Sequence, residues 1–150
     1  MRYLIDFKLF EGVSYDFEES DCFFKRNAKY PSKVEYEFFD KNGHLYVVHF
    51  TSLKQGNFIR DFFIDKDDIN PYKLTNFGDQ WNILQTVTDI TIEFLRKYNP
   101  LTLKIVHVGE KGEGDETKRA IANKRFLQRS VGEIGYGYNL DKSVSMITKL

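Results

Sequence analysis

The chain has 150 residues, and its 22 Lys and Arg residues balance its 22 Asp and Glu residues. This length is typical of one compact domain, and the zero balance argues against binding to nucleic acid or membranes through the field of the whole molecule. Aromatic residues make up 16% of the chain, which supplies ring area for a packed core and favours a compact domain over a disordered chain.

The N-terminal residues 1–12 allow two interpretations. Tyr3, Ile5, Phe7 and Leu9 alternate with polar residues as in a strand, while other apolar residues here fit a helical face. The segment is therefore either an arm or targeting segment, or an edge strand. Residues 13–150 are predicted to form a single α+β domain. Within it, residues 13–31 show no clean period and predict irregular structure with room for one short element.

Three strands in a meander are predicted between residues 33 and 64. Val34, Tyr36 and Phe38 alternate with charged residues, which is typical of a strand with one solvated face. The Asn42-Gly43 pair favours a tight turn because both residues tolerate positive φ. The returning strands are expected at residues 45–50 and 58–64, followed by a loop to residue 79.

A long helix is predicted over residues 78–98. Its apolar residues recur at helical spacing, with Asp79 as the N-cap and Asp89 on the solvent side. Pro100 disfavours helical geometry at Asn99, so the helix should end there. A buried strand should follow at residues 101–108. The residues expected to face the sheet are Ile83, Val87, Ile90 and Phe94.

The last part of the chain predicts a second helix over residues 116–131, stopped by Gly132, and a closing hairpin of residues 134–138 and 143–147. The predicted fold class is α+β. We expect a single sheet of about six strands with two helices, in the order β-β-β-α-β-α-β-β. The sheet should be of mixed direction, because helix crossovers favour parallel neighbours.

A cluster of cations on the second helix is the main candidate binding surface. Basic residues near a helix C-terminus complement the helix dipole, which is one interpretation. The other is a basic ridge that binds nucleic acid or an acidic partner. The cluster consists of Lys118, Arg119, Lys124, Arg125 and Arg129.

No catalytic, metal or cofactor site is predicted. His44, His49 and His107 have no further ligands at metal-binding spacing and are expected to be structural. Cys22, the one cysteine, excludes an internal disulfide, and its neighbours Phe23 and Phe24 favour a buried, inert thiol. The glycine-rich loop 109–115 is acidic and would repel phosphate, so a connector is expected there.

The predicted order of elements resembles the GNAT-type acetyltransferase fold. Gly135-Tyr136 is similar to the Gly-Phe step into that family's last hairpin. The resemblance implies acetyl-CoA binding by a Gln/Arg-x-x-Gly-x-Gly/Ala loop before the central helix. Here Lys73–Gln80 contains one glycine beside an acid, and the family's tyrosine has no counterpart among Phe126, Leu127 and Val131. We therefore predict the fold without the cofactor site. The alternative is an acyl-CoA-dependent N-acetyltransferase with a divergent loop.

A second resemblance covers residues 75–150. The sequence from Phe94 to Pro100, followed by a strand, a basic helix and a Gly-Tyr hairpin, is similar to small proteins of T-even-like bacteriophages. It also resembles the N-terminal domain of the ADP-ribosyltransferase that those phages package in their heads. Proteins of that group carry a targeting segment cut after Leu/Ile-x-Glu, which Leu9, Glu11 and Gly12 match.

The phage resemblance implies a non-catalytic accessory protein. Its expected partner is a phage or host protein, and nucleic acid remains the alternative through the basic helix. Its expected location is the host cytoplasm or the virion. No apolar run approaches the ~20 residues of a membrane-spanning helix, and charges interrupt any signal-peptide core, so neither secretion nor membrane binding is expected.

Overall fold

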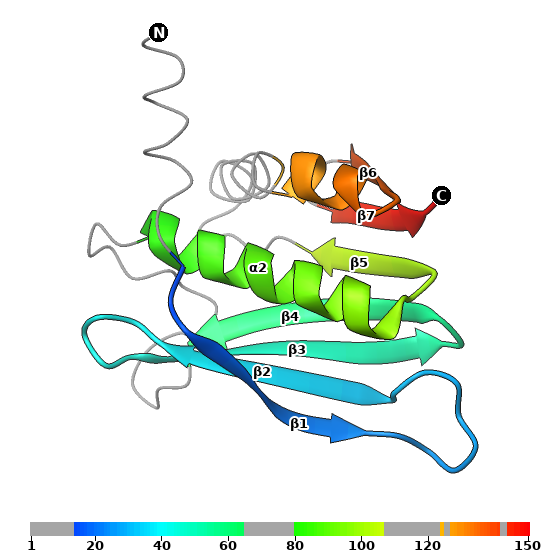
Figure 1. Cartoon of the computed structure of the whole chain (residues 1–150), viewed down its shortest axis with the longest axis horizontal. Helices are drawn as coiled ribbons and strands as arrows, with labels where there is room; N and C mark the ends of the chain where they lie inside the picture. The colour runs from blue at the N-terminus through cyan, green and yellow to red at the C-terminus, as the bar shows by residue number, and fades with distance from the viewer. Residues whose placement is uncertain (1–13, 65–79, 107–123, 125–126, 142–143) are drawn as a thin grey trace, which may run out of the picture.

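The structure is a computed structural model that describes residues 14–64, 80–106, 124, 127–141 and 144–150. These residues form one seven-stranded sheet in the order β1-β2-β3-β4-β5-β7-β6, with the long helix α2 across one face (Figure 1). Helical residues 127–133 precede β6. The elements are β1 (Phe17–Phe23), β2 (Lys33–Phe39), β3 (Leu45–Lys54), β4 (Asn57–Ile64), α2 (Gln80–Tyr98), β5 (Thr102–Val106), β6 (Tyr136–Asp141) and β7 (Val144–Lys149).

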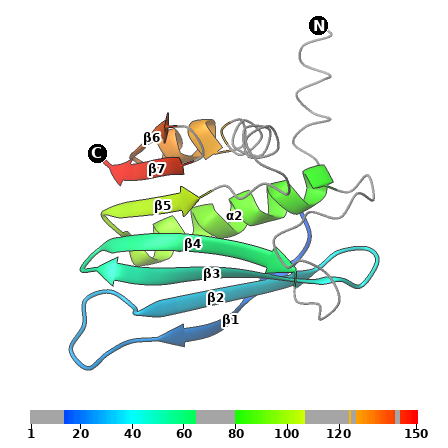
Figure 2. The same ribbon diagram turned by 180° about the vertical axis from the view of Figure 1, so that it is seen from behind.

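The sheet is of mixed direction, as predicted. Strands β1 to β4 form an antiparallel meander, and β4 pairs with β5 in parallel. Helix α2 makes the crossover between β4 and β5. Strand β7 lies between β5 and β6 and is antiparallel to both. The order of elements implied by the acetyltransferase resemblance is thus present, with one additional strand at its start. From behind, β1 to β5 lie in front of α2 with no described helix over them (Figure 2).

The additional strand is β1, so the prediction of about six strands was wrong by one. Phe17 and Glu19 are half-buried, but the register with β2 shifts between Glu19 and Asp21, and Cys22 is the next residue to turn inward. The extra residue of a bulge interrupts the two-residue period of a strand. A glutamate at an inward position hides the pattern further. These two features explain why the sequence shows no clean alternation here.

The core lies between the sheet and α2, and the predicted helix face is confirmed. Ile83, Val87, Ile90 and Phe94 are all fully buried. Their spacing brings one side of the helix onto the sheet, as a 3.6-residue period requires. The predicted solvent position of Asp89 was wrong. Its carboxylate is half-buried and accepts hydrogen bonds from the side chains of Ser14 and Gln85.

The end of α2 is also as predicted. Asn99 donates its backbone N–H to the Leu95 carbonyl at 3.0 Å and adopts a φ of 51°, the left-handed conformation that closes many helices. Pro100 then prevents another turn. The Tyr136 hydroxyl donates to the Pro100 carbonyl at 2.8 Å, which attaches this helix end to β6.

Several boundaries near the C-terminal half differ from the prediction. The second helix passes through Gly132 and ends at residue 133, and Gly135 has the positive φ, 87°. Strand β5 starts at Thr102, so Leu101 is 46% exposed rather than buried. Strands β6 and β7 begin later than the predicted hairpin strands. The predictions for residues 1–12, Asp79, His107 and the 109–115 loop lie outside the described residues. None of the described helices has the length and apolarity to cross a membrane.

Two turn glycines provide a matched test of backbone strain and packing. Gly43 and Gly56 both have a φ of 81°, so alanine at either position costs on the order of 1 kcal/mol. A Cβ atom at Gly43 would meet nothing within 4 Å, whereas one at Gly56 would lie 2.8 Å from Leu101 Cγ. We expect Gly56→Ala to lose about 1 kcal/mol more stability than Gly43→Ala in urea unfolding. Equal losses would show that Leu101 moves aside freely.

Candidate functional site

Three connections and the end of one strand meet at one end of the sheet, on the right of Figure 1. They are the β1–β2 connection, the β3–β4 turn, the α2–β5 turn and the end of β7. Ser52 donates its N–H to the Ser32 carbonyl at 2.9 Å, and Leu101 donates to Gly56 at 2.7 Å. The N–H of Lys149 donates to the Leu101 carbonyl at 2.9 Å. These backbone hydrogen bonds join segments that are far apart in sequence into one surface.

Large apolar side chains are exposed on this surface. Phe23 is 56% exposed, Phe24 47%, Leu53 56% and Leu101 46%. Phe24 packs with its ring centroid 6.3 Å from that of Tyr98, so its position is defined by contact with α2. A single exposed apolar residue needs no explanation, but a group of them on one surface indicates an interaction site.

Positive charge surrounds these apolar side chains. Lys25, Arg26, Lys29, Lys54 and Lys149 are all exposed, and no ion pair to them is found among the described residues. The β1–β2 connection, residues 24–32, contains no acidic residue. The chain has no net charge, so this local excess of cations reflects an uneven distribution. We call these five cations, together with Phe23, Phe24, Leu53 and Leu101, the basic end.

A small polar cluster fixes α2 to β1 beside the basic end. Glu19 Oε1 accepts hydrogen bonds from Lys97 Nζ at 3.0 Å and from the Tyr98 hydroxyl at 2.7 Å. The Tyr98 hydroxyl oxygen also lies 3.3 Å from Cys22 Sγ. Burial by itself would raise the pKa of Glu19, but the hydrogen bonds from Tyr98 and Lys97 outweigh it and lower this pKa. Burial, with Cys22 and Glu19 nearby, raises the pKa of Tyr98. Glu19 is therefore ionised and Tyr98 protonated at neutral pH.

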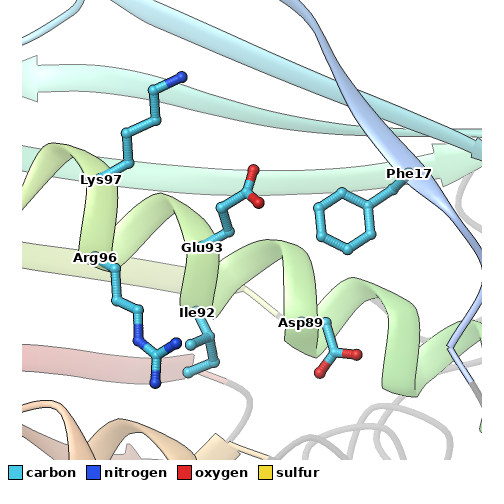
Figure 3. A pocket seen from close by; sticks show the side chains of 6 residues that line it. All are labelled: Phe17, Asp89, Ile92, Glu93, Arg96 and Lys97. Carbon is cyan, nitrogen blue, oxygen red and sulfur yellow. The ribbon is translucent and has the colours of Figure 1, made fainter.

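A groove of about 520 Å³ runs between β1 and the outer side of α2 (Figure 3). It offers carboxylates, cations and one aromatic ring, but no serine, cysteine or histidine that could act as a nucleophile. The lining residues are Phe17, Asp89, Ile92, Glu93, Arg96 and Lys97.

The two described histidines have structural partners. His44 Nδ1 lies 3.0 Å from Asp40 Oδ2 within the β2–β3 hairpin. His49 Nε2 lies 2.7 Å from Glu35 Oε2, and its ring packs edge-on against Phe63. Among the described residues, no group of three His, Cys, Asp or Glu side chains is placed to hold a metal ion.

The predicted site residues are only partly within the described chain. Lys124 and Arg129 are both exposed. Lys118, Arg119 and Arg125 lie outside the described residues, as do the processing residues Leu9, Glu11 and Gly12. The basic ridge on the second helix thus stays a prediction.

The expectation for Cys22 needs correction. The thiol is half-buried, whereas Phe23 and Phe24 are both exposed. The prediction from the sequence assumed that these two rings are buried around the cysteine. It therefore did not identify them as part of the exposed basic end. The available signal was the run of Lys25, Arg26 and Lys29 directly after two adjacent phenylalanines, without an intervening acid.

Comparison with known proteins does not identify a family for this chain. No family model matches the chain, and no curated protein matches it. One similar solved structure is a point mutant of spermidine N-acetyltransferase from Vibrio cholerae, with a TM-score of 0.40 and 10% sequence identity. The match covers 79% of this chain and 66% of that enzyme, so this chain spans just under two thirds of its length.

Proposed function

We propose that this protein is a non-catalytic accessory domain that binds an acidic protein through the basic end. The observation that carries the proposal is the adjacency of exposed Phe23 and Phe24 to the exposed cations Lys25 and Arg26. Protein interfaces are enriched in aromatic residues and arginine, and charge complementarity selects the partner. Leu53 and Leu101 at the same end cannot stack on bases, which favours a protein partner over nucleic acid.

The test is a charge reversal with a matched control. We expect Arg26→Glu to weaken binding of a fluorescently labelled acidic peptide about fivefold to tenfold, because a like charge then faces the ligand. Lys41→Glu changes the same charge on an exposed residue of the β2–β3 hairpin, at the other end of the sheet, and should have little effect. Fluorescence anisotropy measures both. Equal losses for the two variants would contradict the proposed surface.

Nucleic acid is the alternative ligand for the basic end or for the predicted ridge 118–129. A labelled single-stranded oligonucleotide distinguishes the two ligand classes in the same assay. A steep loss of oligonucleotide affinity with salt, together with no binding of the acidic peptide, would favour a nucleic-acid-binding domain.

An acyl-CoA-dependent N-acetyltransferase is the second candidate function. It is favoured by the order of elements and by the parallel pairing of β4 with β5 before and after α2. We nevertheless expect calorimetry to detect no micromolar binding of acetyl-CoA, because the stretch from Lys73 to Gln80 has one glycine to form an anion-binding backbone nest. Micromolar affinity for acetyl-CoA that is lost on changing residues 76–80 would favour the acetyltransferase over the non-catalytic domain.

The phage resemblance adds a proposal about the biological setting. The protein would be packaged in the virion after cleavage between Glu11 and Gly12 and then delivered to the host. Mass spectrometry of purified virions should then find a chain that begins at Gly12. Deletion of residues 1–11 should leave the melting temperature nearly unchanged. Recovery of only the intact Met1 chain from mature heads, or an unfolded truncation, would contradict the proposal and favour an edge strand.

A further inference from the structure

We propose that the acidic partner of the basic end is a second copy of this chain, which offers an acidic surface at the opposite end of the same two strands. The inference rests on the proposed function and names the partner of that site. The acidic surface consists of three carboxylates beside one exposed ring. We call it the acidic edge, and its residues are Asp16, Glu18, Glu37 and Phe39.

The acidic edge and the basic end lie at opposite ends of β1 and β2. Phe17 pairs with Phe38, so the start of β1 lies beside the end of β2, and the β1–β2 connection joins the strands at the basic end (Figure 1). From Phe17 to Phe23, β1 spans roughly 20 Å at about 3.3 Å per residue. One copy therefore cannot bring its own acidic edge into contact with its own basic end.

The acidic edge has an apolar part as well as a charged one. A groove of about 170 Å³ opens there, and its lining combines rings with carboxylates. Phe39 is 58% exposed at the end of β2, whereas its neighbour Phe38 is buried. Rings and charges side by side are typical of a protein interface. The lining residues are Asp16, Phe17, Glu18, Glu37, Phe38 and Phe39.

The carboxylates of the acidic edge lack a cation. Glu18 and Glu37 are directly opposite in the register of β1 with β2, and like charges in this arrangement destabilise a strand pair. Neither of them, nor Asp16, has an ion pair within the described part of the chain. A cation from another molecule would remove the repulsion. No group of three described side chains is placed to hold a metal ion, so we assign that cation to a protein side chain.

The basic end supplies what the acidic edge lacks. Its exposed rings Phe23 and Phe24 are followed directly by the exposed cations Lys25 and Arg26. An arginine can bind a carboxylate through two hydrogen bonds and can also pack on an aromatic ring such as that of Phe39. The chain has no net charge, so contact between two copies brings an excess of cations onto an excess of carboxylates.

The contact joins two different surfaces, so each pair of copies still has one free basic end and one free acidic edge. Contacts of this heterologous type build open chains or rings. Direct pairing of two β1 edges would instead close a dimer, but the bulge between Glu19 and Asp21 disfavours such pairing. We therefore expect the copies to assemble head to tail.

Sedimentation equilibrium of the full chain measures the self-association. Between about 10 μM and about 1 mM, the average mass should rise from that of the 17.7 kDa monomer to more than that of a dimer. It should fall again toward the monomer in about 0.5 M NaCl, which screens the charges. A wild type that stays monomeric over this range, or that stops at a dimer, would overturn the proposal.

Two complementary charge reversals test the surfaces. Arg26→Glu changes the basic end and Glu18→Lys changes the acidic edge, so each variant alone should self-associate about tenfold more weakly. An equimolar mixture should form heterodimers and nothing larger, because only one intact pair of surfaces remains. Asp141→Lys is the control, since Asp141 is exposed on β6 at the opposite edge of the sheet, and it should assemble like the wild type.

Folding of the acidic-edge variant has its own measurement. Glu18→Lys should preserve or raise the melting temperature, because an opposite charge then faces Glu37 across the strand pair. Asp16→Lys makes the same charge change just before β1 and should weaken assembly in the same way. Folded Glu18→Lys and Asp16→Lys variants that assemble like the wild type would exclude the acidic edge.

The results separate this inference from the proposed function. Loss of acidic-peptide binding in Arg26→Glu, combined with a monomeric wild type, would support the basic end and overturn a second copy as its partner. Unchanged peptide binding in Arg26→Glu would contradict the basic end itself. Glu18→Lys should bind the acidic peptide like the wild type, because its basic end is intact. A mixture of Arg26→Glu and Glu18→Lys that stays monomeric would exclude contact between the two surfaces.

Discussion

Replacing Phe94 with alanine is expected to lower the free energy of unfolding by about 3–5 kcal/mol, the range for emptying a buried aromatic site. Phe94 is fully buried, and its ring stacks on Phe50 with the centroids 3.9 Å apart and the planes 5° apart. It also meets Phe58 edge-on, with the centroids 5.1 Å apart. The side chain thus connects α2 to both β3 and β4, and its loss leaves a cavity that these strands cannot close.

Arg96→Ala is the control for Phe94→Ala, because Arg96 is exposed on the same helix and alanine preserves helix propensity. In chemical denaturation, Arg96→Ala should lower the free energy of unfolding by less than about 0.5 kcal/mol. Asp89→Ala should fall between the two, since Asp89 accepts hydrogen bonds from Ser14 and Gln85. Similar losses for Phe94→Ala and Arg96→Ala would contradict the assigned helix face.

Replacing Asp40 with alanine is expected to cost about 3 kcal/mol or more, because several hydrogen bonds converge on one buried carboxylate. The Asp40 side chain is fully buried. It accepts from the backbone N–H of Asn42 at 2.8 Å and of His44 at 3.0 Å, and from the Tyr46 hydroxyl at 3.0 Å. Alanine leaves these donors without their acceptor at the turn of the β2–β3 hairpin. Asp40→Asn preserves the shape and one carbonyl acceptor, so it should cost less.

The pH dependence of stability should report on the same carboxylate. Burial by itself would raise the pKa of Asp40, but the hydrogen bonds from His44, Asn42 and Tyr46 lower it below the ordinary value of 3.8. The unfolded chain therefore binds this proton more readily than the native one. The stabilisation is complete above the unfolded value and is lost as the pH falls through the native value.

Urea unfolding from about pH 6 to about pH 3 should thus show the stability difference between the wild type and Asp40→Asn shrinking toward the acidic end. A difference that stays constant over this window would show that the native carboxyl is not held ionised. The comparison with Asp40→Asn removes the contribution of the other acidic groups, because those are common to both proteins.

Elements whose pattern is local could be predicted from the sequence. The core face of α2 follows from the spacing of Val87, Ile90 and Phe94, and its end follows from Asn99-Pro100. The β2–β3 hairpin follows from the alternation around Asn42-Gly43. In each case the residues that determine the element lie close together in the sequence. Their pattern can therefore be recognised without knowledge of the fold.

The tertiary structure decided the rest. Strand β1 depends on pairing with β2 across a bulge after Glu19, which makes Cys22 the next inward residue and erases the two-residue period. The basic end exists because hydrogen bonds between Ser52 and Ser32, and between Leu101 and Gly56, bring three connections together. The complete burial of Tyr36 likewise depends on how β1 and α2 cover β2. These features depend on contacts between residues that are far apart in the sequence, and the local spacing of apolar residues does not indicate such contacts.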